Sequence, residues 1–300
     1  MENNEDDIRT LTWKDHMRLR PEMYIGKLGD GSDSEDGVYA MLRVIINNAV
    51  DEAWLGLGNQ IEVTLEGNHL TVRNFGRGIP FPKVESMVLG ESLHCMMPAS
   101  YYLYHSLRPI EYALVCALSS EMTIESYRDG KMKRISASRG EIILNEVPVE
   151  TDQPNNLFIS FIPDKDIFGD YQLDAQIICY ILSIYAAGTP GLKLSFGDKV
   201  FYHPDGMMGL LKELKDVDFQ NAIRMNNCLY DLAIVPVTEN AHGKIISIVN
   251  GHLTLNRGPL VDTLIETLFD VLSESHEETQ KSDICSGFFI CLNILLSAKP

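Results

Sequence analysis

The chain has 300 residues, 45% of them hydrophobic, so it can form one large or two medium packed domains and is too apolar for wholesale disorder. Its formal net charge of −17 argues against direct DNA binding, because phosphate contacts require a basic face. Six scattered cysteines without a CxxC pair argue against a zinc site and indicate a reducing, cytoplasmic location. No leader pattern and no apolar run of bilayer length is present, so membrane insertion is disfavoured.

The first two thirds of the chain alternate helical and extended patterns. Residues 13–20 predict a short helix stopped by Pro21, and apolar residues at a helical period predict a longer helix over 38–54. Alternating segments at 61–65 and 70–74 predict a β-hairpin. The later predicted elements are a helix over 109–118, strands over 122–127, 133–137, 141–144 and 157–162, a helix over 174–187, strands over 192–196 and 200–202, and a helix over 208–215.

The last third predicts a second, smaller unit. Strands are expected over 229–237 and 244–249, followed by an amphipathic helix over 259–274. An apolar run over 285–296 has the length of a strand. Together these patterns predict an α+β protein with domains 1–217 and 218–300.

Three short motifs carry a resemblance to a known family. They read RPEMYIG at residues 20–26, NAVDEA at 48–53 and GRGIP at 76–80. In this order and spacing they resemble the RPxMYIG, NxxDEA and GRGIP signatures of type IIA DNA topoisomerase B subunits, those of gyrase and topoisomerase IV, and most resemble the topoisomerase IV type. The resemblance implies a GHKL (Bergerat) α/β sandwich with a mixed sheet, followed by a ribosomal-S5-like transducer domain that is incomplete at its C-terminus relative to the family.

The family's catalytic helix is altered where the resemblance places it in this chain. Val44 occupies the position of the family's general base, and a valine cannot accept a proton. No catalytic residue is therefore expected. Asn48 matches the magnesium-binding asparagine and is the one residue implied as a weak metal ligand. Glu52 is expected to pair with Arg77, as the family's equivalents do.

The adenine end of the implied site is altered too. Asn74 stands where the family has an aspartate that accepts from the adenine amine, and an asparagine gives no charge assistance. Counting back from Pro163 places Leu157 where the family has a threonine. The residues of the degenerate nucleotide site that the resemblance implies are Asn48, Glu52, Asn74, Gly76, Arg77, Gly78, Ile79 and Pro80. Without the resemblance, the polar face of the 38–54 helix would be interpreted as solvated surface.

The phosphate end departs furthest from the family. A glycine-rich lid is expected at residues 106–111, yet no glycine occurs between Glu91 and Asp129. Pro109 removes a backbone donor, and Glu111 adds a negative charge. The family's γ-phosphate lysine follows the last transducer strand, and the sequence ends at Pro300 before it.

The leading interpretation is a pseudo-ATPase that keeps the family fold and acts by binding a topoisomerase subunit or a second copy of itself. No cofactor is expected; ATP and magnesium are the cofactors if nucleotide binding is retained. One alternative is the ATPase fragment of a working topoisomerase subunit. The other is a nucleotide binder that does not hydrolyse.

Overall fold

A computed structural model describes residues 11–90, 109–213, 217–238, 242–254, 258–274 and 280–295. Contacts divide the chain into two compact units, Met1–Glu52 with Ile61–Ile178 and Ala53–Gln60 with Cys179–Pro300. Both units combine helices and strands, and the expected α+β class with a mixed sheet is confirmed. The domain boundary after residue 217 stays a prediction.

The first unit opens with two short helices and one long one. Helix α1 (Trp13–Leu19) begins where Thr12 accepts a hydrogen bond from the Asp15 amide, a standard N-cap. The RPEMYIG motif forms α2 (Glu22–Ile25), which ends at Gly26 with a left-handed φ of 75°. Helix α3 (Gly37–Trp54) follows and matches the predicted 38–54 helix.

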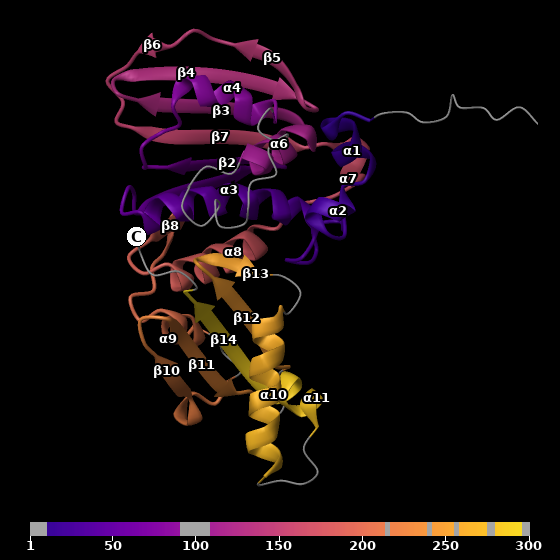
Figure 1. Cartoon of the computed structure of the whole chain (residues 1–300), viewed down its shortest axis with the longest axis vertical. Coiled ribbons are helices and arrows are strands. Elements are labelled where there is room, and N and C mark those ends of the chain that lie inside the picture. Colours follow the sequence, from indigo (N-terminus) through magenta and orange to yellow (C-terminus); the bar gives the residue numbers. More distant parts are fainter. Residues whose placement is uncertain are drawn as a thin grey trace, which may run out of the picture. The chain divides into compact units, whose positions relative to one another are not determined.

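The sheet of the first unit has the strand order β5-β4-β3-β7-β2-β1, and these pairings are antiparallel (Figure 1). Its strands are β1 (Gln60–Glu66), β2 (His69–Asn74), β3 (Ser119–Arg128), β4 (Lys131–Ser138), β5 (Glu141–Asn145) and β7 (Asn156–Pro163). The predicted hairpin is the β1–β2 pair. A two-residue strand, β6 (Val149–Glu150), also pairs with β4 and was not predicted.

Helices α4 (Phe81–Val88) and α6 (Pro109–Ala117) contact each other and strands β3 and β4. Helix α6 was predicted from the sequence, whereas α4 was not. Pro80 precedes α4, and Pro82 lies in its first turn, where a missing N–H costs nothing. A short helix α7 (Lys165–Phe168) was not predicted either, whereas α8 (Ala175–Gly188) matches the helix predicted over 174–187.

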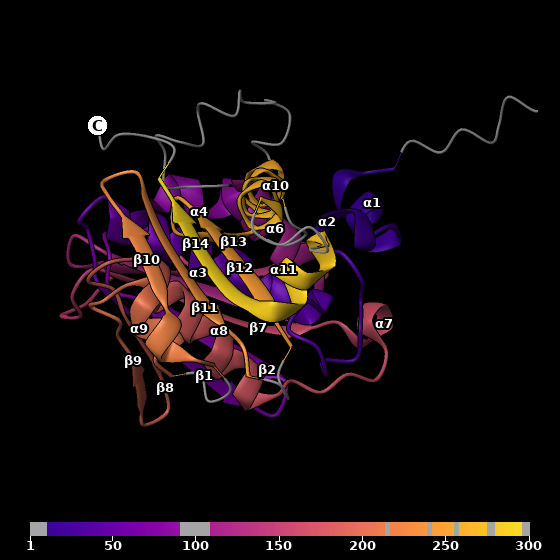
Figure 2. The ribbon, with the colours of Figure 1, turned by 90° about the horizontal axis from the view of Figure 1, so that it is seen from below.

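The second unit contains a five-stranded sheet in the order β10-β11-β14-β12-β13, with β12 and β14 parallel (Figure 2). Its strands are β10 (Ile223–Asn226), β11 (Tyr230–Pro236), β12 (Lys244–Val249), β13 (His252–Thr254) and β14 (Phe288–Ile294). The unit also holds the hairpin β8 (Lys193–Phe196)–β9 (Lys199–Phe201), helix α9 (Met207–Leu211), the 3-10 turn Phe219–Asn221 and helix α10 (Pro259–Ser273). The strands β10 and β13 were not predicted.

Alternating side chains of β11 pack into two hydrophobic cores, one on each face of this sheet. Ala233 and Val235 pack with α9 on one face, and Leu232 and Ile234 pack with α10 on the other. This alternation follows from the two-residue period of a strand. Both faces are therefore covered by helices.

The apolar run predicted as one strand over 285–296 is wrong at its start. Residues Lys281–Gly287 form helix α11, and β14 begins only at Phe288. Gln280 and Asp283 form a reciprocal capping box that starts this helix and overrides the apolar pattern. The 208–215 helix is likewise shorter and ends at Leu211. Within the described parts of the chain, no helix is long and apolar enough to cross a membrane.

Candidate functional site

A small cavity in the first unit collects most of the residues that the sequence motifs singled out. Its volume is about 10 Å³. A cavity needs roughly 10–15 Å³ to hold one water molecule, so this one holds at most about one. The described residues that line it come from α3, β2, the turn after β2, α6 and β7: Asn48, Glu52, Asn74, Gly78, Ile79, Tyr112 and Leu157.

Strands β2 and β7 place Asn74 directly opposite Leu157. The assignment of Leu157 to the family's threonine position, made by counting back from Pro163, stays a prediction. Both side chains are buried, with 8% and 5% of their surface exposed. Asn74 Oδ1 accepts a hydrogen bond from the Gly76 amide at 3.2 Å. Leu157 offers neither a donor nor an acceptor to the cavity.

The turn after β2 is tied to α3 by the predicted ion pair. Arg77 donates from Nη2 to Glu52 Oε1 at 2.7 Å, and its Nε and backbone N–H both donate to Oε2 at 3.2 Å. The hydrogen bond to Glu52 raises the pKa of Arg77. Arg77 and Gly76 themselves lie outside the cavity lining. Pro80 does too, and it precedes the first turn of α4.

The same turn is held from the other side by strand β3. The buried Ser126 hydroxyl accepts from the Ile79 amide and donates to the Ile79 carbonyl, both at 2.7 Å. Gly78 has a left-handed φ of 69°, and a Cβ there would lie 2.4 Å from the Tyr127 carbonyl oxygen. Only glycine fits this position, so the glycine is explained by packing of the turn alone.

The α3 positions that the resemblance assigns to catalysis, Val44 and Asn48, present no side-chain group that could act as a base. Asn48 is 2% exposed, and its Nδ2 donates to the Val44 carbonyl at 3.0 Å, within the same helix. Val44 is half-buried and does not line the cavity. Among the described residues, no group of three or more His, Cys, Asp or Glu side chains could hold a metal. A magnesium–nucleotide complex does not fit the residues as they stand, because the cavity is too small.

Tyr112 is a cavity residue that sequence reasoning missed. It lies in α6, is 1% exposed and places the only aromatic ring on the described cavity wall. Tyr112 directly follows residues 106–111, the segment interpreted as a degenerate lid. Its position in the predicted helix is that of an ordinary core residue, so the sequence does not single it out. Residues 106–108 of that segment lie outside the described residues. Residues 109–111 form the first turn of α6.

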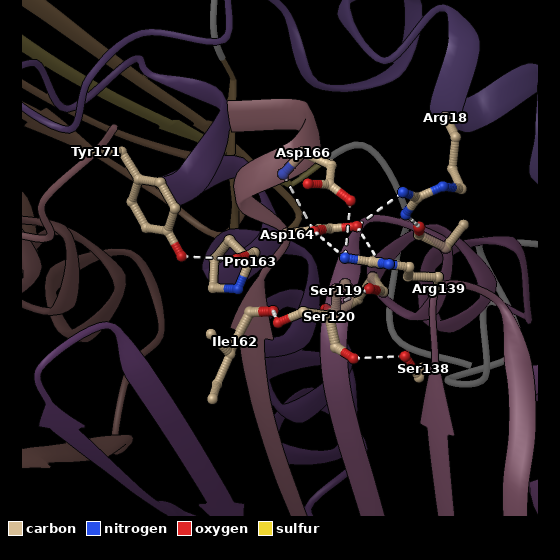
Figure 3. A network of polar contacts seen from close by, with 12 residues as sticks. Arg18, Ser119, Ser120, Ser138, Arg139, Ile162, Pro163, Asp164, Asp166 and Tyr171 are labelled. Carbon is tan, nitrogen blue, oxygen red and sulfur yellow. Dashed lines mark hydrogen bonds and ion pairs between the residues drawn. The ribbon is translucent and has the colours of Figure 1, made fainter. Parts of the chain in front are cut away.

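A second polar cluster lies at the other end of β7 (Figure 3). Asp164 is 1% exposed and accepts from Arg18 Nη2 at 2.7 Å, from Arg139 Nε at 2.8 Å and from the Asp166 amide at 3.1 Å. Burial would raise the pKa of Asp164, but the hydrogen bonds from Arg139 and Arg18 outweigh it and hold that pKa below its usual value. These groups bind one another, so the cluster is structural.

An open groove of about 660 Å³ in the second unit is larger than the cavity of the first. It lies between α10, α11 and the start of β12, and its charged side chains, including the paired Lys281 and Glu266, are exposed. The described polar side chains along it are thus well solvated. It therefore lacks the buried polar groups that mark a built site.

Comparison with known proteins finds relatives of one kind, the B subunits of bacterial type II topoisomerases. The chain is 29% identical to the B subunit of DNA topoisomerase 4 from Borreliella burgdorferi over 306 residues, covering 97% of this chain and 49% of that protein. It is 33% identical to the DNA gyrase B subunit of Thermus thermophilus over 232 residues, covering 70% of this chain and 35% of that protein. The chain thus spans at most about half the length of these relatives. No protein-family model matches it.

Solved structures agree on the fold. The 43K ATPase domain of Thermus thermophilus gyrase B, solved with an aminocoumarin, is 25% identical with a TM-score of 0.64, covering 95% of this chain and 81% of that one. The ATPase region of Saccharomyces cerevisiae topoisomerase II is 18% identical with a TM-score of 0.75, covering 98% and 87%. The second likeness concerns the fold alone.

Proposed function

Since the chain is homologous to the B subunits of type IIA DNA topoisomerases and has the GHKL fold of their ATPase region, we propose that it is a pseudo-ATPase. It keeps this fold, does not turn over ATP and acts through protein interaction. The observation that carries the proposal is the cavity of about 10 Å³ at the position where the resemblance puts adenine. Sites for small molecules are typically ~300–1,000 Å³, far larger than this.

The α3 face supports the same proposal. General-base catalysis needs a proton acceptor within hydrogen-bond reach of the attacking water. Val44 has none to offer, and the Asn48 amide nitrogen donates to the Val44 carbonyl of its own helix. Glu52 has its carboxylate engaged by Arg77 and is no substitute base. Both binding and chemistry are thus impaired at separate residues.

The proposed partner is a topoisomerase subunit or a second copy of this chain. The net charge of −17 disfavours direct DNA contact by this region, because a duplex-binding surface needs a basic face. The relatives are themselves subunits, as their names state, which favours a protein partner of that kind.

Phosphate release from magnesium–ATP tests the proposal. The purified chain is compared with the Thermus thermophilus gyrase B ATPase region, measured side by side as the positive control. We expect the chain to release phosphate at the rate of the buffer blank. Steady turnover that disappears in Asn48→Ala would overturn the proposal, because it would place ATP hydrolysis in this site.

A second candidate function is the ATPase portion of a longer, working topoisomerase subunit. It is favoured by the length of the relatives, of which the chain covers only 49% and 35%. The same phosphate-release assay on a protein made from the complete natural reading frame tests it. ATP turnover dependent on Asn48 in that longer protein, and absent from the 300-residue chain, would favour this candidate.

A third candidate is a nucleotide binder without hydrolysis. The Glu52–Arg77 pair and the glycine turn keep the rim of the site in place, which favours it. Titration calorimetry with ATP, ADP and a non-hydrolysable analogue tests it. Heats indistinguishable from dilution exclude this candidate at the concentrations used.

A further inference from the structure

We propose that His203 is a pH-sensitive switch in the second unit: its neutral ring holds helix α9 against helix α8, and protonation of the ring releases α9. The residues involved all belong to this unit, which contains α8 from Cys179 onward. The proposal therefore goes beyond the proposed function and does not depend on it.

The His203 ring is enclosed between α8 and α9. It is 4% exposed, and its Nε2 forms a hydrogen bond of 2.8 Å with the Ser183 hydroxyl of α8. Gly209 of α9 lies on the other side. A Cβ at this position would be 3.4 Å from His203 Nδ1, so the α9 backbone lies directly against the ring. His203 thus connects the two helices from the inside.

These contacts satisfy a neutral imidazole but not a charged one. A protonated ring carries two N–H donors, and the Ser183 hydroxyl is placed to accept only the one at Nε2. His203 Nδ1 faces Glu213 Oε1 at 3.8 Å, which is longer than a hydrogen bond. Protonation therefore creates a buried charge with one donor that lacks a close acceptor, and such a charge destabilises the packed state.

Glu213 opposes this effect but is too solvated to reverse it. Its side chain is 59% exposed, and its Oε2 already accepts from the Ser183 hydroxyl at 3.3 Å. Exposed ion pairs contribute little, because water screens them. Burial accordingly lowers the pKa of His203 below its ordinary value, and Glu213 offsets only part of that shift.

The other charged and titratable groups near His203 pair with one another. They are Asp205 with Lys212 at 2.7 Å, Asp231 with Arg224 at 2.9 Å, Lys199 with the Cys179 thiol at 3.7 Å, and Lys244 with the Tyr180 ring at 4.4 Å. Among the described residues, Ser183 and Glu213 alone have polar side-chain atoms in contact with the ring. The charge state of His203 is therefore set by burial and by these two side chains.

Release of α9 would affect the core that this helix covers. Its residues Met207, Leu210 and Leu211 are at most 4% exposed and pack with Ala233 and Val235 of β11. The helix has only five residues, so it depends on these contacts for its stability. Protonation of His203 therefore loosens this part of the core.

Amide hydrogen exchange of the full chain at about pH 7.5 and about pH 5.5, corrected for the intrinsic exchange rate, tests the proposal. A solvated histidine has a pKa of about 6.5, so at about pH 5.5 protonation favours the open state by up to about tenfold. We expect exchange of the α9 amides to rise about threefold to about tenfold on acidification. Exchange of the α10 amides, in the same unit, should change less than about twofold. An equal rise in α10 would overturn the proposal, because the whole unit would then respond.

His203→Gln removes the titrating group and retains one that can bond to the Ser183 hydroxyl. Its α9 exchange should be the same at both pH values, even if it is faster than in the unchanged chain. His242→Gln is the matched control, since His242 is an exposed histidine of the same unit, and it should respond to pH as the unchanged chain does. A response to pH that persists in His203→Gln overturns the proposal.

If His203→Gln does not fold, NMR titration of the His203 imidazole in the unchanged chain takes its place. The expected midpoint lies below about pH 6.5, and a midpoint at or above this value overturns the proposal. Either outcome leaves the pseudo-ATPase proposal unaffected, because His203 belongs to the second unit and the proposed nucleotide site to the first.

Discussion

Strand β7 (Asn156–Pro163) has polar groups at both ends, but the two ends are built differently. Beyond its C-terminal end, Asp164 is enclosed by two arginines and a backbone amide (Figure 3). At its N-terminal end, Leu157 and Asn74 face a cavity in which the Asn74 amide donor has no acceptor in the described residues. At the Asp164 end, which we call the anchored end, the polar groups bind one another. At the Leu157 end, which we call the pocket end, they border a small cavity.

The difference separates groups that hold the fold together from groups that border a cavity. The anchor depends on charges that bind each other, so no outside group is needed. The pocket end is framed by a glycine turn and the Glu52–Arg77 pair, and these also bind each other. Of the described residues that line the cavity, Glu52 alone is charged, and Tyr112 and Leu157 belong to its uncharged wall. The frame is therefore part of the fold.

The strongest test of this comparison is Gly78→Ala, which should lower the free energy of unfolding by about 3 kcal/mol. The loss combines left-handed strain with overlap against the Tyr127 carbonyl oxygen, which lies 2.4 Å from the added Cβ. Chemical denaturation measures it. Gly67→Ala is the control, since Gly67 has φ of 62° but nothing within 4 Å. It should cost about 1 kcal/mol. Equal losses in the two variants would mean that the turn is not tightly packed.

At the anchored end, Asp164→Asn should lower the free energy of unfolding by about 2 kcal/mol at about pH 7, because charge-assisted hydrogen bonds to two arginines are weakened. Denaturation at neutral pH measures the loss. The neighbouring Asp166→Asn is the control. Asp166 is 66% exposed and pairs with Arg139 at the surface, so its loss should stay below about 1 kcal/mol.

The same variant predicts a pH dependence. The pKa of Asp164 is lower in the folded chain, so its stabilising effect is present above its unfolded pKa of about 3.9 and is lost as pH falls through the folded value. The stability difference between the unchanged chain and Asp164→Asn should therefore shrink below about pH 4. A difference that stays constant down to about pH 3 would contradict a charged Asp164.

On the rim of the pocket, Glu52→Gln should cost about 1 kcal/mol. Arg77 is 45% exposed and can be solvated when its partner is neutral, which limits the loss. Thermal or chemical denaturation measures it. Val84→Ala, a core change in the adjacent helix, should cost more. A larger loss in Glu52→Gln than in Val84→Ala would show that the ion pair outweighs core packing.

The smallest expected effect is on activity. Val44→Glu restores a carboxylate at the general-base position, yet phosphate release should remain at the blank, because the cavity stays at about 10 Å³. Malachite-green detection measures it, and Val44→Gln serves as the isosteric control. Turnover gained by Val44→Glu but not by Val44→Gln would show that the pocket opens readily and that the base was the missing part.

The periodicity of apolar residues along the sequence was enough to predict most of the helices and strands that carry the cavity residues. The two-residue period predicted strands β2 and β7 within a few residues, and the structure shows that these strands pair Asn74 with Leu157. The Glu52–Arg77 pair followed from the family resemblance. Helix α4 was not predicted and the start of β14 was predicted wrongly, since short helices are decided by caps and prolines more than by apolar pattern.

The closure of the pocket could not have been predicted in this way. It depends on how α6 is rotated against β2 and β7, which are separated from it in sequence. Tyr112 has the same helical spacing as an ordinary core residue, and nothing in its neighbours marks it as a cavity wall. Only the packing reveals that this ring lines the cavity and that Val44 does not.

The hydroxyl of Ser126, which both donates to and accepts from Ile79, affects how ATPases can be recognised from sequence. It secures the GRGIP turn from within the sheet, so contacts of the fold itself hold this turn in its conformation. The presence of this turn in a sequence therefore indicates the fold and is not by itself a sign of ATP hydrolysis.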